Sequence, residues 1–155
     1  MSLIDTVESD QRWLRAAIEL SRSCPPSQTA FSVGAVIVDS GGALVGEGYS
    51  RRDDPHDHAE EVALRQLPDA KDPRLGAATL YSSLEPCGAR SSRPRSCASL
   101  ILDTPIQRIV FAWREPSVFV TGEGAELLRA AGRTVVEIPD LAPLAREANR
   151  HLLAE

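Results

Sequence analysis

The segment His58-Ala59-Glu60, followed by Pro86-Cys87 and later by Cys97, constrains the fold of this chain more than any other feature. Histidine and cysteine side chains are ligands that zinc prefers in proteins. If His58, Cys87 and Cys97 hold one ion, the fold must bring together three points that are distant in the sequence. Nine residues separate the two cysteines, so the ligand-bearing segments cannot form one tight turn.

The spacing of Glu60 from His58 indicates that Glu60 is not a ligand of the same metal. On a helix, residues two apart project from different sides, so His58 and Glu60 cannot both act as ligands in the way that residues four apart can. A catalytic zinc keeps three protein ligands and one open position. We therefore expect His58, Cys87 and Cys97 to bind zinc as the cofactor, and Glu60 to move protons at a water that the metal activates.

Two other interpretations remain open from the residues alone. The three residues could close a structural zinc site of a non-enzymatic binding module together with a fourth ligand, or they could be unrelated residues of the core. The sequence offers no clear fourth ligand, because Cys24 is better explained as a small apolar residue at a helix end. Glu60 separates these classes, since hydrolysis needs a carboxylate at this position and a binding module does not.

The composition fits one soluble domain that acts on a small molecule. A chain of 155 residues buries a substantial core, and we expect a single domain over residues 1–155. The formal net charge of -5 and the absence of an extended basic tract argue against nucleic acid as a partner. No apolar run approaches the roughly 18 residues of a membrane-spanning helix. Three cysteines do not suit a disulfide framework, which favours a cytoplasmic location with reduced thiols.

Apolar periodicity predicts helices that alternate with strands after an initial hairpin. The predicted helices cover residues 10–23, 58–67, 96–102, 123–131 and 141–153, and the predicted strands cover residues 31–38, 43–49, 78–82, 106–112 and 134–138. Asp57 is expected to cap the second helix. This order indicates an α/β fold with a mixed five-stranded sheet covered by helices in three layers.

Beyond the metal motif, the sequence resembles the cytidine-deaminase superfamily, and within it the deaminase domain of the bifunctional riboflavin-biosynthesis protein. The similarity extends over about residues 10–153 and is carried by Val33-Gly34-Ala35-Val36-Ile37-Val38, Gly46-Glu47-Gly48-Tyr49, His58-Ala59-Glu60, Thr79-Leu80-Tyr81, Leu84-Glu85-Pro86-Cys87, Glu115-Pro116 and the stretch from Gly122 to Gly132. That family also has a long insertion between its two zinc cysteines. The resemblance implies the cytidine-deaminase-like fold, a zinc cofactor and Glu60 as the proton carrier. It also implies a homodimer or homotetramer that releases ammonia from a diaminohydroxyphosphoribosylaminopyrimidine.

The chain departs from the riboflavin enzymes around the expected substrate contacts. Thr29-Ala30-Phe31 stands where they have Pro-Asn-Pro, and Ser50 stands where they have His. On the family pattern, the expected substrate-binding residues are Phe31, Ser50, Ala59, Arg90, Arg93, Glu115 and Ser117. The departures leave open a stand-alone deaminase of another aminopyrimidine or aminopurine, as a base, nucleoside or nucleotide.

Arg90, Arg93 and Arg95 lie in the loop between the two cysteines. Guanidinium groups offer paired donors that match phosphate oxygens, so this loop is expected to bind the phosphate of a nucleotide. The alternative is a solvated basic loop, because arginines are mostly exposed. For Trp113, at the end of the fourth predicted strand, stacking on a substrate ring and packing in the core both remain open.

Overall fold

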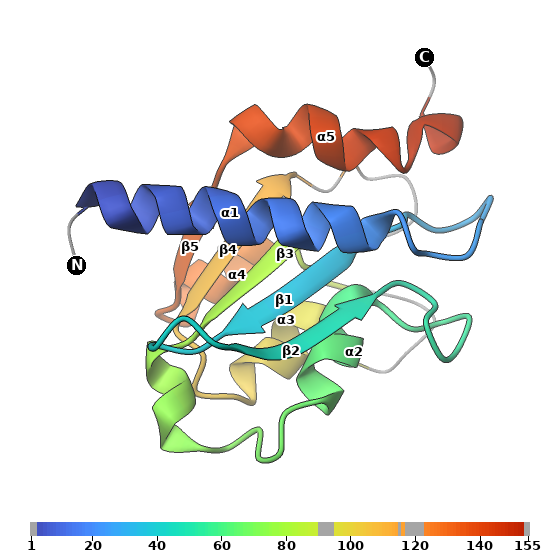
Figure 1. Ribbon diagram of the computed structural model, residues 1–155. Coiled ribbons are helices and arrows are strands. Elements are labelled where there is room, and N and C mark those ends of the chain that lie inside the picture. The colour runs from blue at the N-terminus through green and yellow to red at the C-terminus, as the bar shows by residue number, and fades with distance from the viewer. Residues whose placement is uncertain (1–2, 90–94, 115, 117–122, 154–155) are drawn as a thin grey trace.

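A five-stranded mixed sheet forms the centre of the computed structural model, which describes residues 3–89, 95–114, 116 and 123–153 (Figure 1). The strands are β1 (Gly34–Val38), β2 (Leu44–Tyr49), β3 (Thr79–Leu84), β4 (Arg108–Trp113) and β5 (Thr134–Glu137). They lie in the order β2-β1-β3-β4-β5. β1 is antiparallel to β2 and β3, whereas β3, β4 and β5 are parallel.

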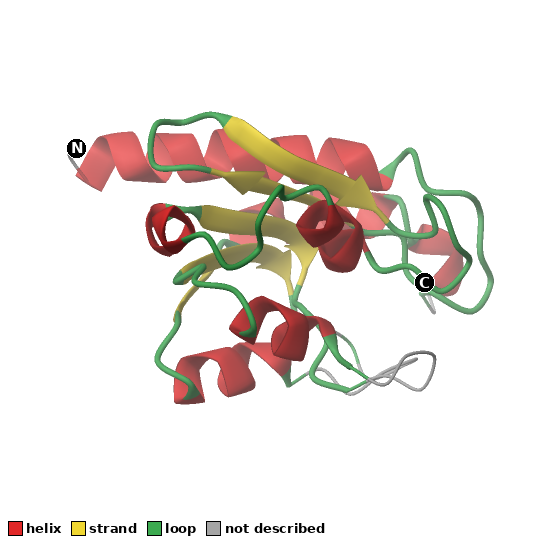
Figure 2. Cartoon of the chain, turned by 90° about the horizontal axis from the view of Figure 1, so that it is seen from below, coloured by secondary structure: helices red, strands yellow, loops and turns green. Residues whose placement is uncertain are grey.

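Helices cover both faces of the sheet. α1 (Leu3–Ser21) and α5 (Ala142–Glu147) lie on one face, and α2 (Ala59–Arg65), α3 (Cys97–Leu102) and α4 (Gly124–Ala130) lie on the other (Figures 1 and 2). Short 3-10 helices are formed by Pro73–Ala77, Pro139–Leu141 and Arg150–Leu152. The predicted three-layer α/β fold is therefore confirmed. Within the described residues, no helix has the length and apolarity needed to cross a bilayer.

The ends of several elements differ from the prediction. α1 begins at Leu3 and not at residue 10, and the closing helix stops at Glu147. β1 begins at Gly34, after the predicted start at residue 31. The amides of Ser32 and Val33 donate to side-chain oxygens of Asn149 and Ser50, at 2.5 and 2.9 Å. The amides of this segment are thus bonded by side chains, although the carbonyl of Val33 accepts the amide of Ser50, and apolar periodicity does not reveal these side-chain contacts.

A buried ion pair fixes α1 on the sheet. The Asp10 carboxylate, 4% exposed, accepts the hydroxyl of Tyr81 at 2.7 Å and two nitrogens of Arg108 at 2.6 and 2.5 Å. Leu14, on the same helix, is fully buried in the core. α1 is therefore held to β3 and β4 by a paired charge as well as by its apolar face.

Close packing of α2 against β2 positions the helix on which the metal motif begins. A Cβ atom added to Gly48 would lie 2.8 Å from the carbonyl oxygen of Ala59 and 2.7 Å from the Cβ of Val62. Real side chains do not tolerate such distances, so glycine allows the helix to rest directly on the strand. The start of α2 is thereby fixed at one edge of the sheet.

Candidate metal centre and active site

His58 is the N-cap residue of α2, directly before its first residue, Ala59. Its backbone is extended, with φ -93° and ψ 153°, and its amide donates to Glu61 Oε1 at 2.8 Å. The prediction that Asp57 caps this helix is wrong. The Asp57 side chain is fully buried and accepts Arg65 Nη2 at 2.7 Å, at the last residue of α2. His58 is thus placed at the helix end by Glu61, while Asp57 secures the loop before it.

The two cysteines come from different elements and meet His58 at one point. Cys87 follows the end of β3, and Cys97 is the first residue of α3, whose N-cap Ser96 accepts the amide of Ser99. The sulfur of Cys87 lies 3.6 Å from His58 Nδ1, and the sulfur of Cys97 lies 3.3 Å from the same nitrogen. Both cysteines are buried, at 3% and 0% exposure. The predicted convergence of these residues is confirmed.

The spacing of the three donor atoms fits a zinc ion. All three lie within 4.8 Å of one another. Tetrahedral zinc with Zn–S of about 2.3 Å and Zn–N of about 2.0 Å places sulfur and nitrogen ligands roughly 3.6 Å apart. The observed separations of 3.6 and 3.3 Å are close to that value. Within the described residues this is the one such group, and it lacks a fourth protein ligand.

The surroundings of Cys87 favour the thiolate that a metal needs. A hydrogen bond with the Cys97 side chain is the largest cause that lowers the pKa of Cys87, to about 4, and contacts with His58 lower it further while burial opposes them. The backbone amide of Cys97 also donates to the sulfur of Cys87 at 3.2 Å. A thiolate is the form in which cysteine binds a metal.

Glu60 lies in the first turn of α2, two residues after His58, and is not part of the metal-ligand cluster. It is 4% exposed, and Ala59 before it is fully buried. Among the described residues, the group of mutually close donor atoms does not include the Glu60 carboxylate. This agrees with the expectation from spacing that His58 and Glu60 serve different purposes.

The remaining described residues of the predicted substrate site lie next to strand ends, with Phe31 shortly before β1 and Ser50 directly after β2. Phe31 packs edge-on against Trp113, with ring centroids 5.2 Å apart and planes at 67°. Trp113 is 7% exposed, and its carbonyl accepts the amide of Glu85 at 2.8 Å. Ser50, at the end of β2, is buried, and its hydroxyl accepts the amide of Val33. Arg90, Arg93, Glu115 and Ser117 lie outside the described residues.

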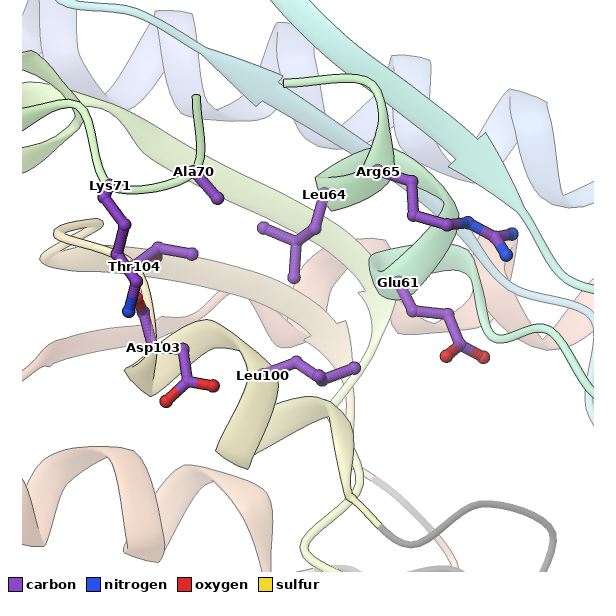
Figure 3. A pocket seen from close by; sticks show the side chains of 8 residues that line it. All are labelled: Glu61, Leu64, Arg65, Ala70, Lys71, Leu100, Asp103 and Thr104. Atoms are coloured by element: carbon purple, nitrogen blue, oxygen red, sulfur yellow. The ribbon is translucent and has the colours of Figure 1, made fainter. Parts of the chain in front are cut away.

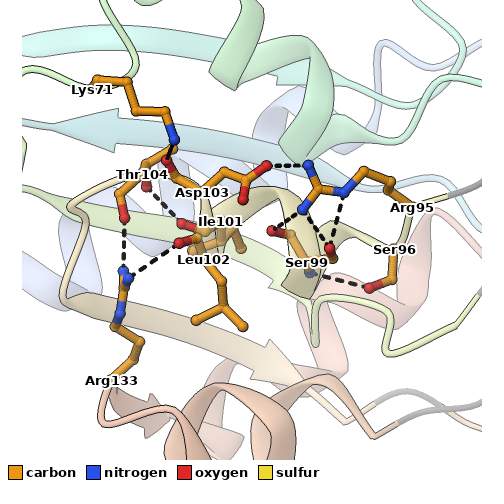
Figure 4. A network of polar contacts seen from close by, with 9 residues as sticks. All are labelled: Lys71, Arg95, Ser96, Ser99, Ile101, Leu102, Asp103, Thr104 and Arg133. Carbon is orange, nitrogen blue, oxygen red and sulfur yellow. Dashed lines mark hydrogen bonds and ion pairs between the residues drawn. The ribbon is translucent and has the colours of Figure 1, made fainter.

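Arg95 is engaged by α3 and not by the metal cluster. Its guanidinium donates to the hydroxyl and the carbonyl of Ser99 at 2.6 and 3.0 Å, and it forms an ion pair with Asp103 (Figure 4). Lys71 donates to the carbonyl of Asp103 at 2.6 Å. The expectation that Arg95 helps to bind a phosphate is therefore not supported, because its donors already have acceptors on the helix.

A cavity of about 360 Å³ lies between α2 and α3. α2 contributes Glu61, Leu64 and Arg65, and Leu100 of α3 lies across from them (Figure 3). Neither the three metal-ligand candidates nor Glu60 line this cavity. It is a feature separate from the metal centre, although both are built on the same two helices.

Two charged residues near the site were not predicted from the sequence. Glu85, 1% exposed, accepts the amide of Ala125 at 3.0 Å and so connects the segment before Cys87 to α4. Arg51 donates to the carbonyl oxygens of Pro25 and Phe31. Glu85 could have been found from the sequence, because it directly precedes the Pro86-Cys87 motif. Nothing in the sequence distinguishes Arg51 from the other loop arginines.

Solved structures share this fold. The structure of RibD from Acinetobacter baumannii (form 2) superposes with a TM-score of 0.80 and 32% identity, over 96% of this chain and 40% of that one. The Rib2 deaminase of Aspergillus oryzae, solved in complex with DARIPP as a C-terminal deletion mutant, matches with a TM-score of 0.68 and 26% identity, over 93% and 96% of the two chains.

Curated relatives match in sequence. A protein of Schizosaccharomyces pombe named diaminohydroxyphosphoribosylamino-pyrimidine deaminase is 39% identical over 129 residues, which is 82% of this chain and 31% of that protein. A protein of Haemophilus influenzae named tRNA-specific adenosine deaminase is 37% identical over 108 residues, which is 67% of this chain and 58% of that protein. The chain thus spans about a third of the length of the first relative.

A sequence profile covers most of the residues that build the site. It is described as "Cytidine and deoxycytidylate deaminase zinc-binding region" and matches residues 7–113, which include His58, Glu60, Cys87 and Cys97. The zinc-binding character of the family agrees with the donor set and its spacing. The chain belongs to the cytidine and deoxycytidylate deaminase zinc-binding family.

Proposed function

We propose that this protein is a zinc-dependent hydrolytic deaminase of an aminopyrimidine nucleotide, of the kind used in riboflavin biosynthesis. The observation that carries the proposal is the meeting of the donor atoms of His58, Cys87 and Cys97, with the buried Glu60 two residues after His58 on the same segment. Three ligands leave one position open, as catalytic zinc requires. A structural site in a binding module is less consistent with this geometry, because such sites usually close with four ligands.

The metal would be held by His58 Nδ1 and by the two cysteine sulfurs. When bound, zinc lowers the pKa of a water from about 16 towards 7. The lowered pKa of the Cys87 thiol suits it to coordination at neutral pH. The chain itself supplies the anionic sulfur ligands and orients the imidazole at the start of α2.

Glu60 would carry protons during the reaction. It takes one proton from the water that adds to the amino-bearing ring carbon and delivers it to the ring nitrogen. It then takes the second proton, from the hydroxyl now on that carbon, and passes it to the amine, so that the C–N bond breaks, ammonia leaves and a carbonyl remains on the ring. Its position in the first turn of α2, outside the donor cluster, supports this role.

The proposed substrate is diaminohydroxyphosphoribosylaminopyrimidine. The name of the S. pombe relative and the DARIPP complex of the A. oryzae structure support this choice. Ring contacts are assigned to Phe31, Ser50, Ala59, Glu115 and Ser117, and the phosphate is assigned to Arg90 and Arg93.

A second candidate is a deaminase of another aminopyrimidine or aminopurine. It is favoured by the change at Ala30, where the riboflavin enzymes have Asn, since the next residue, Phe31, packs its ring against Trp113 and offers no amide to the substrate. Buried hydrogen-bonding groups decide between substrates by orders of magnitude, so this change bears directly on specificity. A tRNA substrate is disfavoured by the net charge of -5.

Residues 1–155 are proposed to form one domain that acts in the cytoplasm in a homodimer or homotetramer, with no nucleic acid or membrane partner. The reduced cysteines that zinc needs suit that compartment. Sedimentation at high protein concentration tests the assembly, and a monomer there would contradict it.

Ammonia release from a panel of substrates tests the function. The panel contains the proposed nucleotide, its dephosphorylated nucleoside, cytidine, deoxycytidylate, adenosine and guanine. The zinc-loaded protein is expected to prefer the proposed nucleotide. A Cys97→Ala variant, expected to lose most of its zinc, is the control. Preference for a purine or a free base would favour the second candidate, and inactivity on every compound would contradict both.

A further inference from the structure

Arg51 occupies a costly backbone conformation next to the candidate site. Its φ is 61°, and within the described chain no other non-glycine residue has a positive φ. Residues other than glycine rarely adopt a positive φ, and they keep it only where contacts with the surrounding structure hold them there. The contacts of Arg51 identify what holds it.

The guanidinium of Arg51 fastens the loop that leads into β1. Nη2 donates to the carbonyl of Pro25 at 2.7 Å and to the hydroxyl of Ser32 at 2.8 Å. Nη1 donates to the carbonyl of Phe31 at 3.0 Å, and Nε donates to Pro25 at 3.2 Å. Lysine cannot reproduce this planar set of donors. The loop of residues 25–32, here called the wall loop, is thus bound at both ends by one side chain.

The backbone of Arg51 is bonded to the segment that directly precedes His58. Its amide donates to the carbonyl of Asp57 at 2.9 Å. Asp57 directly precedes His58, and its buried carboxylate is paired with Arg65 of α2. Arg51 therefore connects the wall loop to the residue before the first metal-ligand candidate.

The wall loop contains Phe31, whose ring packs edge-to-face against Trp113. Asn149 holds the same loop from the opposite side, because it accepts the amide of Ser32 and donates to its carbonyl. With Asn149 and Arg51 both engaged, the position of the Phe31 ring is fixed relative to His58. If Arg51 is removed, Asn149 still holds Ser32, so the wall loop loosens without unfolding the sheet.

We propose that Arg51 is a positioning residue for substrate binding, which holds Phe31 and the wall loop in place relative to the segment that ends at His58. This inference rests on the proposed deaminase function. It assigns Arg51 no contact with the reacting atoms. Its effect is therefore expected in substrate binding and not in the chemical step.

Kinetics of Arg51→Lys and Arg51→Met provide the first test, with Arg52→Met as the matched control. Arg52 is the adjacent arginine, and its ion pair with Asp53 is exposed and long at 3.9 Å. Both Arg51 variants should raise KM by about tenfold, the size expected when charge-assisted hydrogen bonds that order a loop are lost. kcat and zinc content should change less than about twofold, and Arg52→Met should match the wild type.

Fluorescence of Trp113 provides a second test that does not depend on activity. The chain has 2 tryptophans, so Trp13→Phe leaves Trp113 as the sole reporter. In that background, Arg51→Met should make Trp113 more accessible to acrylamide, while Arg52→Met should not. Melting temperatures verify that each variant is folded.

The two tests separate this inference from the proposed function. If the wild type deaminates none of the compounds, the proposed function is wrong, and the fluorescence alone decides whether Arg51 holds the wall loop. A folded Arg51→Met variant with unchanged quenching, or with unchanged KM in an active enzyme, overturns the inference. A parallel loss of zinc and kcat would also overturn it, because Arg51 would then support the metal centre.

Discussion

Gly124 lies directly against the backbone of Pro86. A Cβ atom at residue 124 would stand 1.7 Å from the Pro86 carbonyl oxygen and 2.7 Å from its carbonyl carbon. Glu85 accepts the amide of Ala125, the second residue of α4. The first turn of α4 is therefore pressed onto the segment that ends at Cys87, and the location of this ligand depends on a helix that contributes no ligand.

Gly124→Ala is expected to weaken the metal centre. The added methyl group must displace the segment of Pro86 and Cys87, and such overpacking costs about 1–3 kcal/mol. The melting temperature and the zinc content per chain should both fall. Gly76→Ala is the control, because the nearest atom to its new Cβ is the carbonyl oxygen of Pro105 at 3.9 Å. Full zinc retention by Gly124→Ala would contradict the dependence of Cys87 on α4.

Asp10→Ala should destabilise the fold without reaching the site. It leaves the partly buried Arg108 and the buried hydroxyl of Tyr81 without their acceptor, and an unsatisfied buried polar group typically costs about 1–3 kcal/mol. Chemical denaturation measures this loss. Glu147→Ala removes an exposed partner of Arg22 and should cost at most about 1 kcal/mol. Equal effects of the two changes would show that the Asp10 pair is not a principal anchor of α1.

The stability of the protein should fall at alkaline pH through Tyr81. Burial first, and then the hydrogen bond to Asp10, raise the pKa of Tyr81 above its ordinary value. Below about pH 10, Tyr81 keeps its proton in both the folded and the unfolded chain, so its contribution to stability is complete. As the pH rises from there toward the folded-state pKa, the unfolded chain loses the proton first, and this contribution is lost. Above pH 10 the free energy of unfolding should therefore fall more steeply for the wild type than for Tyr81→Phe. Parallel curves would refute this linkage.

The metal ligands could be predicted from the sequence because few residue types bind zinc and because one ion needs several such side chains at the same place. His58, Cys87 and Cys97 needed no knowledge of packing to be grouped. The alternation of helices and strands was also visible, since each element carries its own apolar period. In these respects local chemistry and local pattern agree with the final fold.

Polar contacts between distant segments could not be predicted in the same way. Asp57 has the sequence position of a helix cap, but its carboxylate accepts a hydrogen bond from Arg65, and the N-cap is the next residue, His58. Arg51 and Arg52 are neighbours of the same type, and only the fold decides that the first faces carbonyl oxygens of the wall loop. Such contacts depend on which backbone groups lack partners after folding, a property that no single segment contains.

The loop between the cysteines should distinguish phosphorylated from dephosphorylated substrates. Arg90→Ala and Arg93→Ala are expected to raise KM for the nucleotide about tenfold or more, with little change for the nucleoside, because charge-assisted bonds to phosphate are lost. Arg95→Ala is the matched control, since Arg95 is already bonded to Ser99 and Asp103. Its KM ratio should equal that of the wild type. Equal losses on both substrates for Arg90→Ala and Arg93→Ala would exclude phosphate recognition by those arginines.

Turnover by the Glu60→Gln variant, measured together with its zinc content, tests the central claim most directly. Glutamine keeps the size of the side chain and cannot accept a proton from water. The variant should therefore fold, bind as much zinc as the wild type, and release ammonia about 10²- to 10⁴-fold more slowly. Unchanged turnover of the proposed nucleotide by a fully zinc-loaded Glu60→Gln protein would contradict the deaminase mechanism.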